Sequence, residues 1–132
     1  MKSYQGDVLP ATAANEYFRQ VLFTGAKTQL VVMNIKPGED IGEETHDHVE
    51  QILFIYAGNG KVVLDGVESG FKAGDVVVVT PGTKHNFINT GSTDLKIYTI
   101  YSPANHIDGR VHKTREDAVK DREDEEFGHS VQ

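Results

Sequence analysis

Residues 74–89 of this 132-residue chain read GDVVVVTPGTKHNFIN, and this stretch decides the predicted fold. The four valines at 76–79 are typical of a short strand buried on both faces, with Gly-Asp before them and Pro-Gly after them as turn signals. A second short strand is expected at 85–89, beginning at His85 and ending at Asn89. The stretch therefore predicts two strands joined by a tight turn, with a histidine where the turn ends.

Similar short apolar runs, separated by turns rich in glycine, fill the middle of the chain. Strands spaced by about 8–12 residues indicate an all-β sandwich or barrel rather than a parallel sheet with crossover helices. The further expected strands lie at 18–23, 29–35, 41–48, 51–56, 61–64 and 95–101.

Histidines and carboxylates gather in the run GEETHDHVEQ at 42–51. In an extended strand, residues two apart point the same way, so Glu44, His46 and His48 are expected on one face. Two imidazoles with an oxygen donor can hold a divalent metal such as Fe, Mn, Ni or Zn. His85 follows 37 positions after His48, and the turns between them allow it to return opposite.

These spacings resemble the two motifs of the cupin superfamily. His46-Asp47-His48 matches the H-x-H of the first motif, and Gln51 takes the place of its usual glutamate. The second motif, G-x5-P-x-G-x2-H-x3-N, matches over 74–89, except that Thr80 stands where proline is usual. Fifteen residues separate the two motifs, as in small single-domain cupins of the kind described as mannose-6-phosphate isomerase-like. The resemblance covers about residues 29–101.

The resemblance implies a cupin-type β-barrel, a jelly-roll-like double-stranded β-helix, with a metal held by His46, His48, Gln51 and His85. Only two residues separate His48 from Gln51, where three or four are usual. With the usual spacing the first-motif pair is Glu44 and His46, and His48 becomes a pocket residue. Both ligand sets stay open at this point.

The implied function is a small metal-binding cupin with a barrel pocket for a small organic ligand, in the form of an oxygenase or an isomerase or epimerase. The alternative is a non-catalytic sensor or storage module, because Gln51 is a weaker anchor for a cation than a carboxylate. Glu44 and Glu50 are the candidate acids or bases for catalysis. Met33, Phe87 and Tyr98 are apolar strand residues expected in the core. They are also the candidates for binding a substrate at the mouth of the barrel.

One domain is expected, with an N-terminal arm at 1–28, a barrel core at 29–102 and a polar extension at 103–132. Within that extension, residues 115–126 read as a solvated helix or a disordered tail, and His106, His112 and His129 as solvated. An N-terminal strand that covers a partner's sheet edge predicts a homodimer.

The net charge of −7 is uneven, because residues 39–50 carry six acids without a base, residues 116–126 carry a net −5, and the other residues sum to +4. Such acidity argues against nucleic acid as a partner, since phosphate binding needs clustered Lys and Arg. No apolar run is long enough to predict a membrane span. We therefore expect a cytoplasmic protein with no membrane partner. Because there is no cysteine, any metal ligands must be nitrogen and oxygen atoms.

Overall fold

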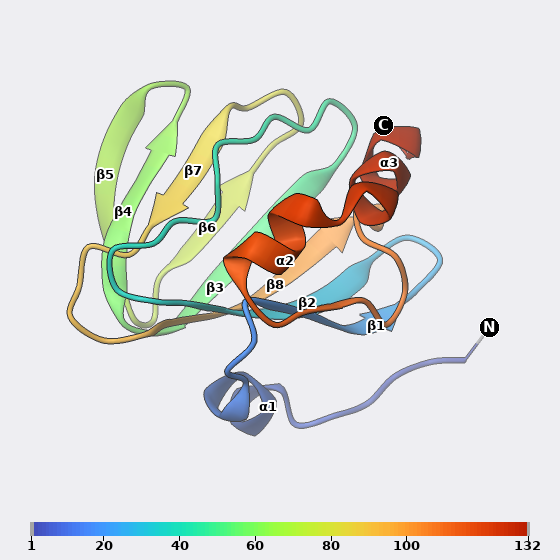
Figure 1. Cartoon of the computed structure of the whole chain (residues 1–132), viewed down its shortest axis with the longest axis horizontal. Coiled ribbons are helices and arrows are strands. Elements are labelled where there is room, and N and C mark those ends of the chain that lie inside the picture. The colour runs from blue at the N-terminus through green and yellow to red at the C-terminus, as the bar shows by residue number, and fades with distance from the viewer. Residues whose placement is uncertain (1, 132) are drawn as a thin grey trace.

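The computed structural model describes residues 2–131, in which nine strands are accompanied by three short helices (Figure 1). The helices are α1 (Val8–Ala14), α2 (Arg115–Lys120) and α3 (Arg122–Ser130). The strands are β1 (Arg19–Thr24), β2 (Gln29–Ile35), β3 (Glu50–Ala57), β4 (Asn59–Leu64), β5 (Val67–Lys72), β6 (Val76–Val79), β7 (His85–Ile88), β8 (Leu95–Ser102) and β9 (Val111–His112).

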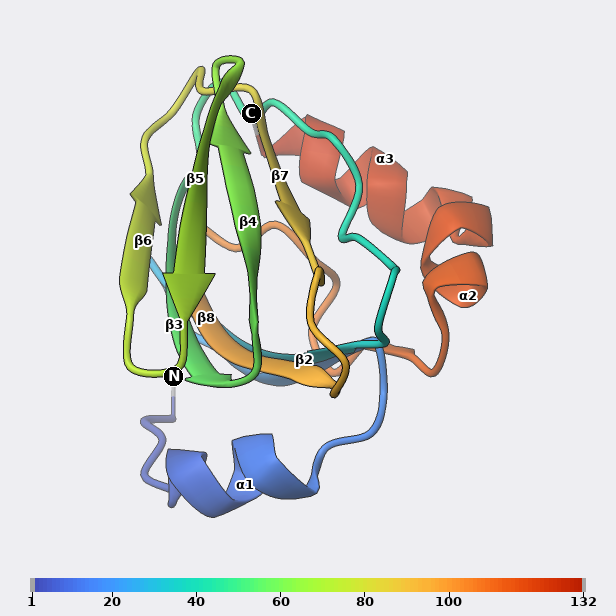
Figure 2. The same ribbon diagram turned by 90° about the vertical axis from the view of Figure 1, so that its left-hand side faces the viewer.

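The strands form two antiparallel sheets that face each other as the two layers of a sandwich (Figure 2). One sheet has six strands in the order β6-β3-β8-β2-β1-β9, and the other has three in the order β5-β4-β7. Hydrogen bonds do not continue from one sheet to the other to close a barrel among the described strands. The all-β prediction is confirmed, with the sheets packed as an open sandwich.

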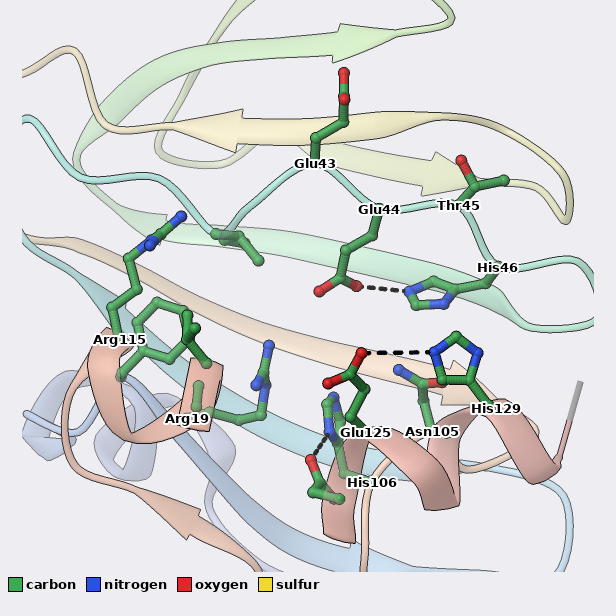
Figure 3. Close-up of a pocket in the computed structure, with 16 residues that line it drawn as sticks. Arg19, Glu43, Glu44, Thr45, His46, Asn105, His106, Arg115, Glu125 and His129 are labelled. Carbon is green, nitrogen blue, oxygen red and sulfur yellow. Dashed lines mark hydrogen bonds and ion pairs between the residues drawn. The ribbon is translucent and has the colours of Figure 1, made fainter. Parts of the chain in front are cut away.

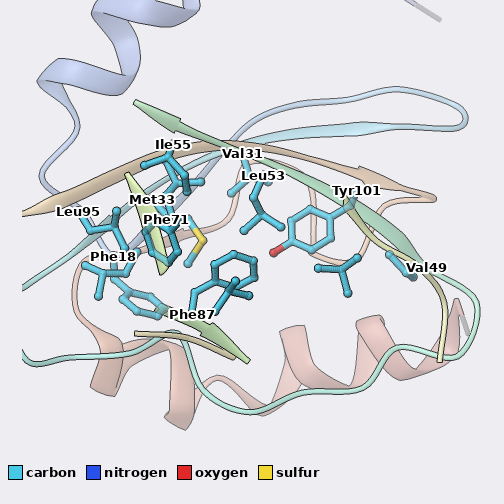
Figure 4. Close-up of a cluster of buried hydrophobic side chains, with 14 of the residues drawn as sticks. Phe18, Val31, Met33, Val49, Leu53, Ile55, Phe71, Phe87, Leu95 and Tyr101 are labelled. Carbon is cyan, nitrogen blue, oxygen red and sulfur yellow. The ribbon is translucent and has the colours of Figure 1, made fainter. Parts of the chain in front are cut away.

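The side chains between the two sheets make the hydrophobic core (Figure 4). Met33 on β2, Leu53 on β3 and Ile97 on β8 come from the larger sheet, and Phe87 on β7 from the smaller one. All four are almost completely inaccessible to solvent. The centre of the sandwich is therefore filled by side chains, and a ligand has to bind elsewhere.

Two details of the predicted strands are wrong. The valines of β6 are not buried on both faces, because β6 lies at the edge of the six-stranded sheet and leaves Val76 and Val78 54% and 50% exposed. Residues 41–48 do not form a regular strand. They run as a loop beside β7, which this part of the chain meets at two isolated bridges, Asp40–Ile88 and Glu44–His85.

Both ends of the chain pack on the sandwich. Strand β1 pairs with β2 and β9 of the same chain, so the strand expected near residues 18–23 is present but already has neighbours on both sides. The helices α2 and α3 lie across the open side of the sandwich, next to the loop at 41–48 (Figure 2). Asp124 and Gly128 on α3 are buried. The helix expected within 115–126 is present, and α2 has no buried residue, but α3 is partly buried and so the C-terminal segment covers this side of the sandwich.

Candidate metal centre

The loop at 41–48 is attached to β7 by backbone hydrogen bonds. The amide of Glu44 donates to the carbonyl of His85 at 2.9 Å, and the amide of His85 donates back to the carbonyl of Glu44 at the same distance. One step along, the amide of Gly82 donates to the carbonyl of His46 at 2.7 Å. Gly82 has φ of +83°, a backbone conformation that glycine adopts without a steric penalty. These bonds set the loop in register with the turn before β7.

The loop register brings Glu44, His46 and His85 together, with one ligand atom of each within 4.8 Å of the others. Glu44 Oε2 lies 2.9 Å from His46 Nε2, and the two imidazole centroids are 5.3 Å apart. His85 Nδ1 lies 2.9 Å from the carbonyl of Thr83. A carbonyl can only accept, so Nδ1 carries the proton and Nε2 keeps a lone pair for a ligand.

The electrostatics of this cluster suit a cation. Burial acts to raise the pKa of Glu44, but the hydrogen bond with His46 and the charge of Arg19 outweigh it and bring that pKa to about 2. Burial lowers the pKa of His85. At neutral pH the cluster therefore holds a carboxylate and an uncharged imidazole, which are the protonation states that metal ligands need.

The other residues predicted for the metal lie differently. His48 is exposed and is not part of the cluster. Gln51 is buried on β3, and its Nε2 donates to Thr99 Oγ1 of the neighbouring strand at 3.1 Å. Glu50, predicted as an acid or base, is exposed at the start of β3 and does not line the cavity described next. The cluster contains three of the four residues of the predicted set that includes Glu44, namely Glu44, His46 and His85.

A cavity of about 420 Å³ lies between the loop at 41–48 and the C-terminal helices (Figure 3). Glu44 and His46 line it, whereas His85 lines a smaller neighbouring cavity of about 70 Å³. Three residues proposed for substrate line neither of them: Met33, Phe87 and Tyr98. The first two are fully buried in the core, and Tyr98 stacks on Phe54 with ring centroids 4.8 Å apart.

The wall opposite Glu44 and His46 holds polar residues whose role sequence reasoning missed. His106 Nδ1 lies 2.7 Å from Asp124 Oδ2, and both side chains are buried. Burial lowers the pKa of His106 to about 4, with a further contribution from the charge of Arg19. The prediction that His106 is solvated is therefore wrong. Residues 115–126 contain only two apolar residues, Ala118 and Val119, and so the sequence carried no signal of a buried face.

A parallel contact joins His112 to the same helix. His112 Nε2 lies 2.9 Å from Asp121 Oδ2, and its Nδ1 lies 3.3 Å from Arg19 Nη1. Arginine can only donate, so Nδ1 accepts and Nε2 donates to the carboxylate. His112, Asp121 and Asp124 also have ligand atoms within 4.8 Å of one another, close enough to hold a metal ion. These atoms are already engaged in the hydrogen bonds just described and in the bond between Asp124 and His106. The three residues form a structural network that holds α3 in place, and His112 is buried where it was expected to be solvated.

Among the residues that the structure describes, no helix is both long enough and apolar enough to cross a membrane. The cytoplasmic location stays a prediction.

Comparison with known proteins agrees with the resemblance seen in the motifs. The family model described as "Cupin domain" matches residues 31–101. The Bacillus subtilis protein YrkC is 41% identical in an alignment of 124 residues that covers 89% of this chain and 67% of that protein. The crystal structure of BH2720 from Bacillus halodurans is 34% identical, with a TM-score of 0.87 over 89% of this chain and 94% of that one. A Thermotoga maritima protein described as a "predicted oxalate decarboxylase" is 30% identical, with a TM-score of 0.55 over 58% of this chain and 66% of that one.

Proposed function

Because the chain belongs to the cupin family, we propose that it binds a divalent metal ion on Glu44, His46 and His85 and a small organic ligand in the adjoining cavity. The observation that carries the proposal is the cluster of three ligand atoms within 4.8 Å of one another. The cavity beside this cluster supports it further. Glu44 and His46 line a cavity whose volume of about 420 Å³ falls in the range typical of small-molecule sites.

The donor set is two nitrogens and one carboxylate oxygen, which suits Fe, Mn, Ni or Zn. A bound ion in this place would supply Lewis-acid chemistry to an oxygen atom of the ligand. Gln51 remains a proposed fourth ligand through its side-chain oxygen. Its amide nitrogen is already bonded to Thr99, and this contact would orient that oxygen as a second-layer partner orients a metal ligand.

The enzymatic form of the proposal is a metal-dependent oxygenase or isomerase. His106 on the cavity wall favours it, because the unpartnered Nε2 of an uncharged imidazole can accept a proton from a ligand. The alternative is a non-catalytic sensor or storage module, which the neutral Gln51 favours. Turnover of any substrate in a panel of small carbonyl and hydroxyl compounds, lost in His85→Gln with the fold intact, would decide for the enzyme.

The metal itself is tested on protein purified without a histidine tag. We expect stoichiometric uptake of Mn²⁺ or Zn²⁺ by calorimetry after chelation, and a loss of about 100-fold in affinity in His46→Gln. His48→Gln is the matched control, because His48 is exposed two positions away and should bind like the wild type. Wild-type protein that takes up no metal would exclude the proposal. Loss in His48→Gln with retention in His46→Gln would exclude this ligand set.

A homodimer remains part of the proposal, but through a different edge from the one first expected. Strand β1 lies inside its own sheet, and it is β6 that leaves an edge with two half-exposed valines, Val76 and Val78. An open strand edge with apolar side chains is suited to pairing with the same edge of a second copy.

A further inference from the structure

Three buried polar atoms on the cavity wall have no hydrogen-bond partner among the described residues: Arg19 Nε, Asn105 Oδ1 and His106 Nε2. Buried polar atoms are nearly always hydrogen-bonded, because an unpaired one loses its water without compensation. All three residues line the cavity of about 420 Å³. Figure 3 shows Arg19 and His106 rising side by side from the wall that faces Glu44 and His46. A ligand in the cavity would therefore supply the hydrogen-bond partners that these three atoms lack.

Arg19 brings a positive charge to this wall. Its side chain is only 5% exposed, and no carboxylate within residues 2–131 comes within the 4 Å of a salt bridge. Its neighbours are the ring of Phe18, the uncharged nitrogen of His112 at 3.3 Å and the side chain of Tyr101, to which it is hydrogen-bonded. Its charge also lowers the pKa of Glu44, whose carboxylate lies beyond the distance of a salt bridge. A buried cation without an ion-pair partner is costly, so an arginine in this setting is complementary to an anion. The planar guanidinium fits a carboxylate best.

His106 brings an acceptor. The carboxylate of Asp124 can only accept at 2.7 Å, so His106 Nδ1 carries the proton and Nε2 offers a lone pair to the cavity. Asp124 is itself fixed, because its other oxygen accepts from the amide of Ile107 at 2.7 Å. Asn105 Oδ1 is a second acceptor on the same wall. These two acceptors can each form a hydrogen bond with a donor on the ligand, such as a hydroxyl group.

From these contacts we infer that the cavity binds a small hydroxycarboxylate, with its carboxylate on Arg19 and a hydroxyl that donates to His106 Nε2. For the end of the ligand that faces Glu44 and His46, the inference rests on the proposed function, in which these residues bind a metal ion. The subsite on Arg19 and His106 uses none of those metal ligands and exists without a metal. Glu43 and Glu125 stand at the rim with side chains more than 60% exposed, where water screens them from a bound anion.

Three probes of equal length separate the two contacts: glycerate has a carboxylate and hydroxyls, propionate lacks the hydroxyls, and glycerol lacks the carboxylate. We expect glycerate to bind wild-type protein about tenfold more tightly than either of the others, measured by NMR titration with and without Mn²⁺. Equal binding of all three, or binding of none, would overturn the inference and leave water as the partner of these atoms.

Two arginines that line the cavity provide a matched pair of variants. Arg19→Gln should weaken glycerate binding by about tenfold or more. Arg115→Gln should change it little, because Arg115 already pairs with Asp40 at 2.8 Å. Arg19→Lys keeps the charge but loses the Nε donor, so an intermediate loss is expected if the fold is kept. An Arg19→Gln protein that binds glycerate like the wild type would refute the inference.

The histidine contact is tested in the same way. His106→Phe keeps a ring against Tyr101, whose centroid lies 5.0 Å away, and should remove the preference for glycerate over propionate. His129→Gln, on an exposed histidine of the same cavity, should keep that preference. Mn²⁺ binding should be retained in all these variants, because none of them removes a proposed metal ligand. If the wild type binds glycerate but no metal, the proposed function is wrong and the subsite on Arg19 and His106 is retained. If it binds metal but no glycerate, only the subsite is wrong.

Discussion

Glu44 and His85 exchange two backbone hydrogen bonds of 2.9 Å, although 41 positions separate them in the chain. This pairing decides which residues of the loop reach the candidate metal centre. With Glu44 opposite His85, the side chain of Glu44 points to the cluster, His46 follows it, and His48 is left exposed. A shift of this register would exchange the acid for a second histidine.

The metal should stabilise the folded chain, because an ion that binds only the folded state adds free energy of unfolding by mass action. At about 100 times its dissociation constant, Mn²⁺ is expected to add about 2.7 kcal/mol, a rise in Tm of about 10 °C. Thermal unfolding with Mn²⁺ and with a chelator measures this difference. The rise should vanish in Glu44→Gln and persist in Glu43→Gln, and an equal rise in both variants would contradict the assignment of Glu44.

Acid should destabilise the protein through His106. Its pKa is about 4 in the folded chain against an ordinary value of 6.5, so between these pH values the unfolded chain binds more protons. The stabilisation is complete above about pH 6.5 and is lost as the pH falls towards 4. Burial lowers the pKa of His85 as well, and its contribution has the same sign.

The full effect of His106 corresponds to about 3 kcal/mol in the free energy of unfolding. Urea denaturation at pH 7, 6 and 5 should show about 2 kcal/mol of this loss, in a range above the pH at which most carboxylates titrate. His129→Gln is the control, because this exposed histidine should leave the pH dependence unchanged. A wild-type protein as stable at pH 5 as at pH 7 would show that His106 is not buried as an uncharged ring.

The sheets and the second motif could be predicted because their signals are local. Alternating apolar residues and turn glycines determine strands such as β2 and β8, and the spacing of Gly74, Gly82 and His85 depends on one tight turn. The cluster of Glu44, His46 and His85, in contrast, depends on how the loop at 41–48 pairs with β7, which is distant in the chain. Residues 44–48 alternate as a strand would, but the loop leaves regular pairing after Glu44, and alternation then no longer says which side chains point inwards.

The C-terminal cover could not be predicted for a different reason. Its buried contacts are made by polar groups, with Asp124 on His106 and Asp121 on His112, and hydrophobic periodicity does not detect those. A carboxylate in an acidic helix looks solvated until the histidine that it bonds is known. Arg19 was missed likewise, because it lies in a strand expected to serve only as an edge.

The edge of β6 predicts the oligomeric state. Val78→Lys places a charge on a half-exposed edge position, and like charges would then face each other in a dimer that pairs through β6. We expect wild-type protein to sediment as a dimer at micromolar concentration and Val78→Lys as a monomer. Val67→Lys on the outer strand β5 of the smaller sheet is the control. A wild-type monomer, or a dimer in Val78→Lys, would rule out this edge.

Gly60 and Gly70 give a matched test of how the smaller sheet packs. Both lie in strands, but a Cβ on Gly60 would run into the carbonyl oxygen of Ile88 and the ring of Phe71, whereas a Cβ on Gly70 meets nothing closer than 3.8 Å. Gly60→Ala should therefore reduce the free energy of unfolding by about 2–3 kcal/mol. Gly70→Ala should be neutral or slightly stabilising, because alanine restricts the unfolded chain. Urea denaturation of the two variants measures the difference, and equal stabilities would mean that β4 does not lie against Ile88 as described.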